Sequence, residues 1–418
     1  MNKLPTNWKE VKLGDIIDII MGQSPKSQFY NKDKEGMPFL QGSSTFGHLY
    51  PSFEVYSNDI KKIAVNGSVL MSVRAPVGDL NMANTDICIG RGLCSINGKN
   101  KSLNRYIFYL LNYYKAKIVN IQTGTVFGAI SKDNILNFKV SIPQSEDEQK
   151  RIASILSSFD DKIELNNKTN KILEEMAQTI FEEWFINFNF PNANGKPYKK
   201  SGGEMINSEL GEIPKGWKID IISNLFNVTI GKTPPRKEIE CFSKNYKDIK
   251  WVSISDMGNS GLFIVDTSEY LTPEAIKKYN VNVVPKNTVI LSFKLTIGRV
   301  SITSEDMTTN EAIAHFNSDN NFINEYLYFY LKNFNYRVLG NTSSIAEAIN
   351  SKIIKSIKII IPKDDILNKY HNIVFDMFKK IRNNQIENQK LSGIRDSLLP
   401  KLMAGEIRID KNFETIHF

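Results

Sequence analysis

The second half of this 418-residue sequence repeats the first half, segment by segment and in the same order. The matching segments are 5–9 with 214–218, 22–25 with 231–234, 69–72 with 289–292, 104–109 with 324–329, and 140–143 with 359–362. The offset between partners drifts only from 209 to 220 residues, which small loop insertions produce and chance matches do not. A repeat of this length predicts two copies of one structural unit.

Each half follows the same plan of short strands followed by one long helix. Roughly 140 residues of short β-type runs, separated by Gly, Asn and Ser turns, surround an aromatic helix near 104–114 or 324–336. With 41% hydrophobic and 23% charged residues, the chain is globular. We expect an α+β protein in which two similar mixed α/β domains are separated by two long helices. The expected segments are a first domain at 1–144, a helix at 145–190, a linker and second domain at 191–362, and a second helix with its tail at 363–418.

Both long helices carry seam residues at alternating intervals of four and three. In the first helix this pattern runs from Ile152 to Trp184, and adding 218 gives the second pattern, from Tyr370 to Leu402. Such spacing over this length favours a coiled coil over an ordinary amphipathic helix. At about 1.5 Å per residue each helix would be roughly 50 Å long. Because each helix follows its own domain, the two should pair antiparallel, giving a pseudo-two-fold internal repeat.

We predict an antiparallel register in which the residue numbers of facing positions sum to 554. The predicted facing pairs are Ile163 with Leu391, Asn166 with Asn388, Asn170 with Asn384, Leu173 with Ile381, Ala177 with Met377, and Trp184 with Tyr370. Buried asparagine layers weaken a seam but penalise slipped registers, so they should hold the helices at one offset. In the alternative arrangement each helix packs separately on its own domain, and the asparagines face water.

The positive charge of the chain lies mainly outside the two helices. The net charge is +8, whereas residues 145–185 carry −5 and residues 363–411 carry +3. The surplus therefore belongs to the globular domains. A basic surplus makes nucleic acid or an anionic membrane the first partners to consider.

The sequence has no feature of a secreted or membrane-spanning protein. Residues 1–12 contain no apolar core of a signal peptide, and no apolar run approaches the ~20 residues that cross a bilayer. Cys88, Cys94 and Cys241 form neither a C-x-x-C pair nor a disulfide framework. We therefore expect a soluble, cytoplasmic protein with reduced cysteines.

Catalytic and cofactor-binding patterns are missing from the sequence. The segment 231–233 lacks the earlier glycine of a phosphate-binding loop, and 90–92 is not followed by the third glycine of a dinucleotide loop. The four histidines are scattered, without the spacing of metal ligands. Asp133 and Glu148 could suggest a metal-dependent nuclease, but acids in the first turn of a helix explain them better. We expect a non-catalytic binding protein with no metal or cofactor of its own.

Polar side chains recur at matching turns of the two halves and are the candidate DNA-reading residues. In the major groove Arg and Lys read guanine, Asn and Gln read adenine, and Ser and Thr read either. The candidates are Gln23, Ser24, Lys26, Gln41, Ser43, Arg74, Arg91 and Thr123 in the first half, and Lys232, Thr233, Arg236, Ser253, Ser255, Lys294, Asn310 and Thr342 in the second. Taken singly, each could also be a solvated turn residue. Core packing explains the tyrosines of the aromatic helices, such as Tyr106 and Tyr326, better than base stacking does.

The predicted geometry suits a DNA target that is split into two halves. Two similar modules at the ends of a roughly 50 Å rod would lie one to two duplex turns apart, with an unread spacer between them. One alternative is a coiled-coil scaffold that organises protein partners without reading DNA sequence. Another is a self-sufficient nuclease or methyltransferase. The basic surplus on the globular domains favours the DNA reader over the scaffold.

Several segments resemble motifs of the specificity (S) subunit of type I restriction-modification systems. They are Ile142-Pro143 with Glu148-Gln149-x-x-Ile152, Ile180-Phe181-Glu182-Glu183-Trp184-Phe185, Gly211-Glu212-Ile213-Pro214-Lys215-Gly216-Trp217, and Leu398-Leu399-Pro400-Lys401-Leu402-Met403-Ala404-Gly405-Glu406-Ile407. In the same order they resemble the family's strand-to-helix junction, its central conserved region, the entry to its second recognition domain, and its C-terminal signature. The resemblance spans essentially the whole chain, duplication included.

The resemblance implies a target-recognition domain in each half, one for each part of a bipartite DNA sequence, held apart by the two conserved helices. It further implies two methyltransferase subunits that methylate adenine N6 with S-adenosylmethionine, and restriction subunits that use ATP and Mg²⁺. Catalysis and base flipping would belong to those partners. The segment 362–367 departs from the family pattern because it lacks the Glu-Gln pair, which leaves open whether the two methyltransferases dock equivalently. Recognition domains vary within the family, so the candidates above rest on residue type alone.

Overall fold

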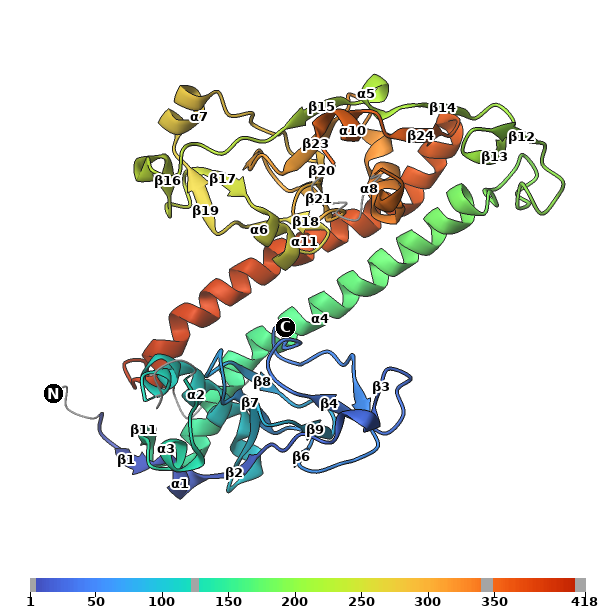
Figure 1. The fold of residues 1–418 in the computed structure, drawn as a ribbon. Coiled ribbons are helices and arrows are strands. Elements are labelled where there is room, and N and C mark those ends of the chain that lie inside the picture. The colour runs from blue at the N-terminus through green and yellow to red at the C-terminus, as the bar shows by residue number, and fades with distance from the viewer. Residues whose placement is uncertain (1–4, 122–127, 340–348, 410–418) are drawn as a thin grey trace. The chain divides into compact units, whose positions relative to one another are not determined.

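Each long helix contributes to both structural units of the chain. The computed structural model describes residues 5–121, 128–339 and 349–409. Unit 1 comprises 1–165 and 390–418, and unit 2 comprises 166–389. Helices α4 (Glu146–Phe181) and α11 (Asp364–Met403) therefore divide between the units (Figure 1), whereas the sequence predicts them as separate segments at 145–190 and 363–418.

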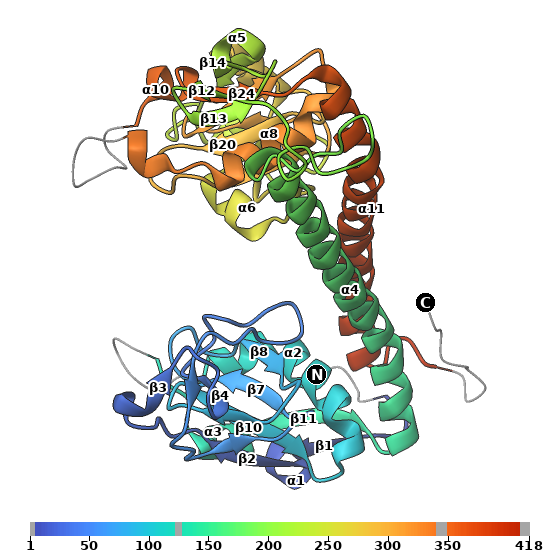
Figure 2. The same cartoon turned by 90° about the vertical axis from the view of Figure 1, so that its right-hand side faces the viewer.

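Unit 1 combines two main sheets and a two-stranded ribbon with a covering helix. Its strands are β1 (Trp8–Lys12), β2 (Ile17–Met21), β3 (Tyr30–Asn31), β4 (Met37–Leu40), β5 (Tyr56–Ser57), β6 (Ile63–Ala64), β7 (Val69–Ser72), β8 (Leu80–Met82), β9 (Ile87–Ile89), β10 (Leu93–Gly98) and β11 (Lys139–Pro143). Its other helices are α1 (Leu13–Ile16), η1 (Ser27–Phe29), η2 (Lys101–Leu103), α2 (Asn104–Val119) and α3 (Lys132–Leu136). The sheets have the orders β2-β10-β7-β8 and β3-β5-β4-β9-β6, and β1 pairs with β11. Helix α2 packs on β7, β8 and β10 (Figure 2).

Unit 2 repeats this arrangement with a few additions. Its strands are β12 (Met205–Ser208), β13 (Gly211–Pro214), β14 (Lys218–Ile221), β15 (Asn227–Ile230), β16 (Phe242–Ser243), β17 (Ile249–Val252), β18 (Phe263–Ile264), β19 (Glu269–Leu271), β20 (Val289–Ser292), β21 (Val300–Thr303), β22 (Thr308–Thr309), β23 (Ile313–Asn317) and β24 (Lys358–Ile361). Its helices are the π-helical turn η3 (Glu182–Ile186), α5 (Ile222–Leu225), η4 (Ile239–Cys241), α6 (Ile254–Asn259), α7 (Pro273–Tyr279), η5 (Asn321–Ile323), α8 (Asn324–Asn333), η6 (Tyr336–Leu339) and α10 (Ser351–Lys355). The main sheets have the orders β15-β23-β20-β21-β18 and β16-β19-β17-β22.

The strand register shows that the two units share one topology. Leu93 faces Ser72 in unit 1, and Ile313 faces Ser292 in unit 2, with 220 residues between the members of each corresponding pair. The second sheet of each unit contains one equivalent parallel pair, β4 with β9 and β17 with β22. The predicted α+β fold with its internal repeat is confirmed.

Aromatic residues of the covering helices fill the core of each unit. Tyr106 and Tyr109 of α2 and Tyr326 of α8 are each at most 1% exposed, which confirms core packing rather than base stacking. Their neighbours in the sheets are β-branched and aliphatic residues, which suit a pleated, half-buried surface. Both long helices begin with acidic residues, Glu146–Glu148 and Asp364–Asp365, which interact favourably with the helix dipole.

Helices α4 and α11 face each other through asparagine layers in unit 2. Asn166 Nδ2 donates to Asn388 Oδ1, and Asn384 Nδ2 donates to Asn170 Oδ1, both at 2.8 Å. In each pair the residue numbers sum to 554, the value of the proposed register. Rising numbers on α4 thus meet falling numbers on α11, so the helices run antiparallel.

Apolar seam positions pack around these layers in each unit. In unit 1, Ile163 and Leu391 belong to one buried cluster. In unit 2, Leu173 and Met377 pack against the core cluster that contains Ala177 and Ile381. At the far end of the unit 2 seam, the rings of Trp184 and Tyr370 are 6.1 Å apart. Within unit 2 the two long helices therefore pack as a coiled coil in which apolar layers follow the asparagine layers.

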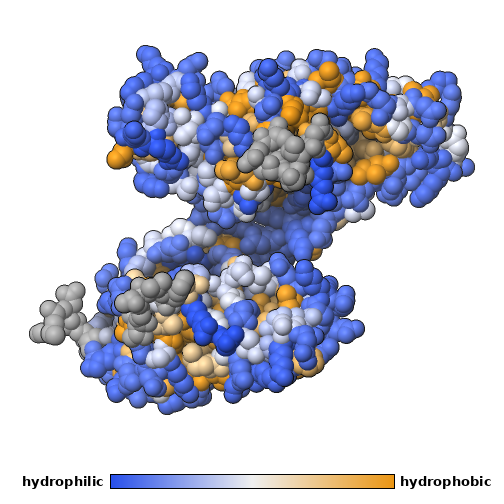
Figure 3. Space-filling view, in the orientation of Figure 1, coloured by the Kyte–Doolittle hydropathy of each residue, from blue (hydrophilic) through white to orange (hydrophobic). Residues whose placement is uncertain are grey.

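The surface of both units is mainly hydrophilic on the face shown in Figure 3, with scattered hydrophobic patches. In the part of the chain that the structure describes, no helix combines the length and apolarity needed to cross a membrane. Cys88, Cys94 and Cys241 are free thiols and all three are buried.

Candidate nucleic-acid interface

In each unit, a loop approaches a turn so closely that only glycine fits. The amide of Gly22, after β2, donates to the carbonyl of Leu93 at 2.9 Å. Its counterpart Gly231, after β15, donates to the carbonyl of Ile313 at 3.0 Å. A Cβ atom added to either glycine would lie 2.1 Å from a carbonyl oxygen of the facing turn. These glycines fix the position of the polar side chains that follow them.

In unit 1, polar residues from three loops meet where the parallel strands β4 and β9 end. Ser24 Oγ donates to Gln41 Oε1 at 2.8 Å and accepts from the amide of Arg91 at 3.1 Å. The amide of Gln23 donates to the carbonyl of Ile89 at 2.9 Å. The side chains of Gln23, Gln41 and Arg91 are exposed. We call Gln23, Ser24, Gln41 and Arg91 the first strand-end cluster.

In unit 2, the equivalent loops meet where β17 and β22 end. Thr233 Oγ1 donates to the carboxylate of Glu311. The amide of Asn310 donates to the carbonyl of the last residue of β17, directly before Ser253 (3.0 Å). Lys232, beside Thr233, is exposed. We call Lys232, Thr233, Asn310 and Glu311 the second strand-end cluster. Ser253 lies beside it but caps α6, and its Oγ donates to Asp256 Oδ2 at 2.7 Å.

The structure identifies the counterpart of Arg91 in unit 2. Among the sequence candidates Asn310 lies nearest to that place, but Arg91 lies two residues before Leu93, as Glu311 lies two residues before Ile313. Since Leu93 and Ile313 hold the same place in their sheets, Glu311 is the equivalent residue. Glu311 is not among the sequence candidates because acids were not counted as DNA readers, although the offset of 220 that relates 69–72 to 289–292 and 104–109 to 324–329 points to it.

A buried histidine supports the second strand-end cluster from below. His315 Nε2 lies 2.7 Å from Thr309 Oγ1, and Nδ1 lies 2.9 Å from Thr229 Oγ1. Burial lowers the pKa of His315 to about 4, so the ring is neutral at neutral pH. The carbonyl of Thr309 in turn accepts from the amide of Lys232 at 2.9 Å. His315 therefore has a structural role rather than that of a metal ligand.

Two further candidates occupy equivalent exposed loops. Arg74 and Lys294 both follow a strand whose last serine closes the loop, because Ser72 Oγ and Ser292 Oγ each donate to a carbonyl four residues later at 2.6 Å. Both cationic side chains are exposed. Leu295, next to Lys294, is 85% exposed. These loops lie outside the strand-end clusters but present a cation at the same place in each unit.

Arg236 is held by its own neighbours. Its guanidinium carbon lies 4.2 Å from the ring centre of Phe242 and 4.5 Å from that of Trp251. It also pairs with Glu269 at 2.9 Å. Stacking and ion pairing already occupy this guanidinium within the protein. Arg236 is therefore a weaker candidate for reading bases than its residue type suggested.

The remaining candidates are not joined to the clusters. Ser43 Oγ donates to Asp79 Oδ2 at 3.1 Å. Lys26 is exposed at the start of η1, and Ser255 is exposed on α6. Thr123 and Thr342 lie outside the described residues.

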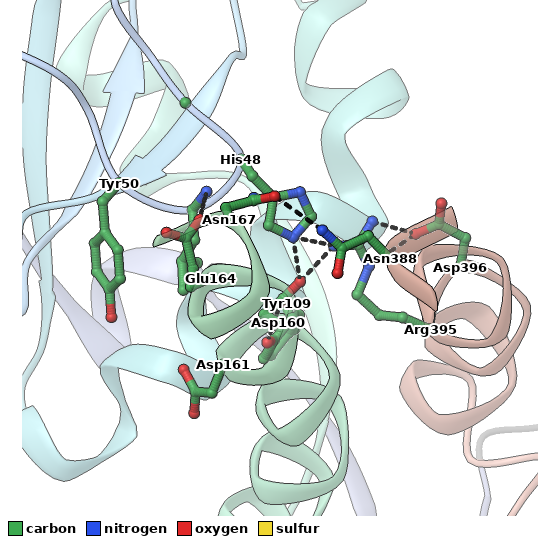
Figure 4. A network of polar contacts seen from close by, with 12 residues as sticks. His48, Tyr50, Tyr109, Asp160, Asp161, Glu164, Asn167, Asn388, Arg395 and Asp396 are labelled. Carbon is green, nitrogen blue, oxygen red and sulfur yellow. Dashed lines mark hydrogen bonds and ion pairs between the residues drawn. The ribbon is translucent and has the colours of Figure 1, made fainter. Parts of the chain in front are cut away.

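The loop that carries Gln41 is anchored to the long helices through a buried carboxylate (Figure 4). Asp160 of α4 accepts hydrogen bonds from Tyr109 Oη at 2.5 Å and from the guanidinium of Arg395 on α11. His48 Nε2, from the loop after β4, lies 3.0 Å from the same carboxylate. Burial alone would raise the pKa of Asp160, but these partners outweigh it, so the pKa lies below its ordinary value.

In unit 2, α11 anchors the equivalent loop by a different contact. The side-chain amide of Gln385 accepts from the amide of Phe263 at 3.0 Å and donates to its carbonyl at 2.9 Å. A main-chain segment bound on both its donor and its acceptor cannot slide along the helix. In both units the long helices therefore hold in place the segment that follows β4 or β17.

The clusters offer exposed hydrogen-bond donors and acceptors on fixed turns. The described residues contain no group of three or more His, Cys, Asp or Glu side chains placed to hold a metal ion. Exposed Gln, Arg, Lys and Glu side chains on fixed turns match the donors and acceptors that base edges present in the major groove. This geometry suits hydrogen bonding to polar groups of a bound partner.

Comparisons with known proteins agree with the repeat and the fold. A family model described as "Type I restriction modification DNA specificity domain" matches residues 5–175 and again 214–395. The MjaIX type I restriction enzyme specificity subunit of Methanocaldococcus jannaschii is 29% identical over 98% of this chain and 96% of its own length. The HindI specificity subunit of Haemophilus influenzae is 26% identical over 96% of this chain and all of its own. A crystal structure of a type I restriction-modification S subunit from M. genitalium has the same fold, with a TM-score of 0.59 at 16% identity over 98% of this chain and 99% of its own.

Proposed function

Because this chain belongs to the type I restriction-modification DNA specificity family, we propose that it reads a bipartite DNA target, one half-site with each unit. The observation that carries the proposal is the pair of strand-end clusters, in which one main-chain frame presents different side chains. A reader of two different half-sites needs a constant frame for positioning and variable side chains for base contacts. The basic surplus outside the helices would supply the phosphate contacts.

We propose that the chemistry belongs to partner subunits. Two methyltransferase subunits would dock on this chain and methylate adenine N6 with S-adenosylmethionine, and restriction subunits would add ATP- and Mg²⁺-dependent cleavage. The chain would act with them in the cytoplasm, as a specificity subunit without catalysis or cofactor of its own. This division of labour is supported by the family and by the polar, turn-based character of both clusters.

The two junctions between recognition domain and helix are built differently, which bears on docking. Gln149 is 6% exposed, and its Nε2 donates to the carbonyl of Pro143 at 2.8 Å. The equivalent position of the second junction is Leu367, which is also buried. The glutamine therefore fixes the turn between β11 and α4 instead of facing a partner. We propose that both methyltransferases dock through the exposed faces around these junctions, whose side chains differ.

The test is to determine which DNA sequences the chain selects with its methyltransferase partner. The two proteins are co-expressed in a host without other adenine methyltransferases, and methylated adenines are mapped across the host genome. We expect two short motifs at one fixed spacing. The chain expressed without its partner should show no methylation, which controls for catalysis by this chain.

Two outcomes would contradict the proposal. Methylation spread over all sequences would indicate a scaffold that brings the enzyme to DNA without reading it. Methylation at a single continuous motif would indicate that only one unit reads DNA. Exchanging unit 2 recognition residues for those of a relative should change one motif and leave the other intact.

A further inference from the structure

The turn between β9 and β10 in unit 1 and the turn between β22 and β23 in unit 2 occupy the same place in the fold. The amide after Ser72 donates to the carbonyl of Gly92 at 2.9 Å, and the amide after Ser292 donates to the carbonyl of Ala312 at 2.9 Å. Each turn therefore has one central residue at an equivalent position. It is Arg91 in unit 1 and Glu311 in unit 2.

The turn of unit 1 presents Arg91 alone. Its neighbours are glycines that lie close to the main chain of Gln41, since a Cβ atom on Gly92 would lie 2.4 Å from Gln41 O and one on Gly90 would lie 3.0 Å from Gln41 Cα. Three consecutive main-chain amides are bound, that of Arg91 by Ser24 Oγ at 3.1 Å and those of the glycines by carbonyls at 2.8 and 3.1 Å. The turn is thus rigid, and its one side chain is exposed.

The turn of unit 2 presents Glu311 in the same way. Asn310 Oδ1 accepts from the amide of Ala312 at 3.1 Å, so the asparagine side chain is used within the turn, and Ala312 is 6% exposed. Glu311 is exposed, and the hydroxyl of Thr233 donates to one of its carboxylate oxygens. That hydrogen bond orients the carboxylate while the other oxygen stays available.

The two central side chains have opposite hydrogen-bonding character. A guanidinium only donates and a carboxylate only accepts. In the major groove guanine presents two acceptors, O6 and N7, which suit arginine, and cytosine presents the N4 donor, which suits a carboxylate. A carboxylate facing DNA is repelled by the phosphates, so a fixed acid at this place requires a specific donor.

We propose that Arg91 and Glu311 are specificity-determining residues, Arg91 reading guanine in one half-site and Glu311 reading cytosine at the equivalent position of the other. The proposal rests on the proposed function, since it assumes that each unit reads a half-site. It adds that the same structural position specifies one G·C pair in each half-site. In unit 1 the protein side chain donates the hydrogen bonds, and in unit 2 it accepts them.

The test compares target sequences of variants in the complete complex with the methyltransferase. Wild type, Arg91→Gln and Glu311→Gln are assayed by genome-wide mapping of methylated adenine and by selection from randomised duplexes. Arg91→Gln should reduce discrimination at one G·C pair of one half-site by about tenfold or more, and Glu311→Gln should do the same in the other half. The charge exchanges Arg91→Glu and Glu311→Arg should exchange guanine and cytosine at those positions.

Matched controls separate base reading from a general loss of charge. Lys196→Gln and Glu212→Gln change exposed residues of the segment between α4 and β14 and should leave both motifs as in the wild type. Copurification with the methyltransferase and an unchanged circular dichroism spectrum establish that each variant folds. Arg91→Lys keeps the positive charge but loses the two parallel N–H donors of the guanidinium, and it should retain only part of the guanine preference.

Two results would overturn the inference while leaving the proposed function intact. Unchanged motifs in all Arg91 and Glu311 variants would show that these residues read no base. Weaker binding to every sequence with an unchanged motif would show that Arg91 contacts phosphate. A wild-type complex without any bipartite motif would instead contradict the proposed function itself.

Discussion

The two units differ at the place where each covering helix meets its long helix. In unit 1, Tyr109 of α2 donates to Asp160 of α4 at 2.5 Å. At the equivalent positions of unit 2, Phe329 of α8 and Phe378 of α11 pack with ring centres 5.9 Å apart. The same backbone arrangement is thus held by a buried charge in one unit and by aromatic packing in the other.

The difference extends to the facing helix of the coiled coil. Arg395 of α11 pairs with Asp160, whereas its equivalent in unit 2, Ala177 of α4, is fully buried in the apolar core. Removing the partner of a buried charge is costly because the charge is left unpaired. Truncating a buried aromatic ring is costly because it leaves a cavity. The stability of unit 1 should therefore fall when a partner of Asp160 is removed. Unit 2 has no buried charge at this place, so no substitution there should have the same effect.

The largest effect is expected from removing the cation that neutralises Asp160. The change Arg395→Ala leaves a carboxylate whose side chain is 2% exposed without the guanidinium that pairs with it. We expect unit 1 to lose about 3–5 kcal/mol of unfolding free energy. Hydrogen exchange resolved by unit, together with denaturant titration, measures the loss.

A matched variant copies unit 2 into unit 1 at the same site. The triple change Tyr109→Phe, Asp160→Phe and Arg395→Ala removes the charge together with its partners. It should be less destabilised than Arg395→Ala alone, because no unpaired charge stays buried. A loss below about 1 kcal/mol for Arg395→Ala would mean that water reaches Asp160 and that the buried-charge account is wrong.

The register and the charge network show what the sequence could and could not predict. Asn166 and Asn388 could be matched because coiled-coil spacing determines which positions face each other. Asp160 could not be distinguished from the exposed Asp161 beside it, since its partners come from three segments remote in sequence. The stacking of Arg236 could not be foreseen for the same reason, because the rings of Phe242 and Trp251 that hold it come from two strands.

The next largest effect concerns acid and should be confined to unit 2. His315 has a pKa of about 4 when folded, against 6.5 for an unperturbed histidine, because burial disfavours its charged form. Between these values the unfolded chain binds a proton that the folded chain does not, so stability falls as the pH drops from 6.5 to 4. The full effect is about 3 kcal/mol.

Tryptophan fluorescence can follow this loss, because three of the four tryptophans, Trp184, Trp217 and Trp251, belong to unit 2. The equivalent residue of unit 1 is Ser95, which cannot titrate in this range. The change His315→Ser should therefore lower stability at pH 7 but remove the pH dependence between 6.5 and 4. An unchanged slope in this variant would assign the acid sensitivity to another group.

A smaller effect is expected from the asparagine layers. Asn384 is 1% exposed, and its Oδ1 has no hydrogen-bond partner although its Nδ2 donates to Asn170. Replacing both residues by leucine should stabilise unit 2 by about 1 kcal/mol, because both polar groups leave together. Asn170→Leu alone should destabilise it by about 1–3 kcal/mol. Denaturant midpoints of the two variants decide, and equal destabilisation by both would show that the layer contributes net stability.

The smallest effect should come from Asp161, the neighbour of Asp160 in sequence. Its side chain is 54% exposed and pairs with Arg105 at 2.7 Å, and such exposed pairs contribute at most about 1 kcal/mol. Arg105 also donates to Tyr50 Oη at 3.0 Å, so it keeps a partner in Asp161→Asn. A denaturant midpoint close to wild type is expected, against a large shift for Arg395→Ala. Equal shifts in the two variants would show that solvent exposure does not determine how much each carboxylate contributes to stability. The proposed difference between the buried Asp160 network and the exposed Asp161 pair would then be wrong.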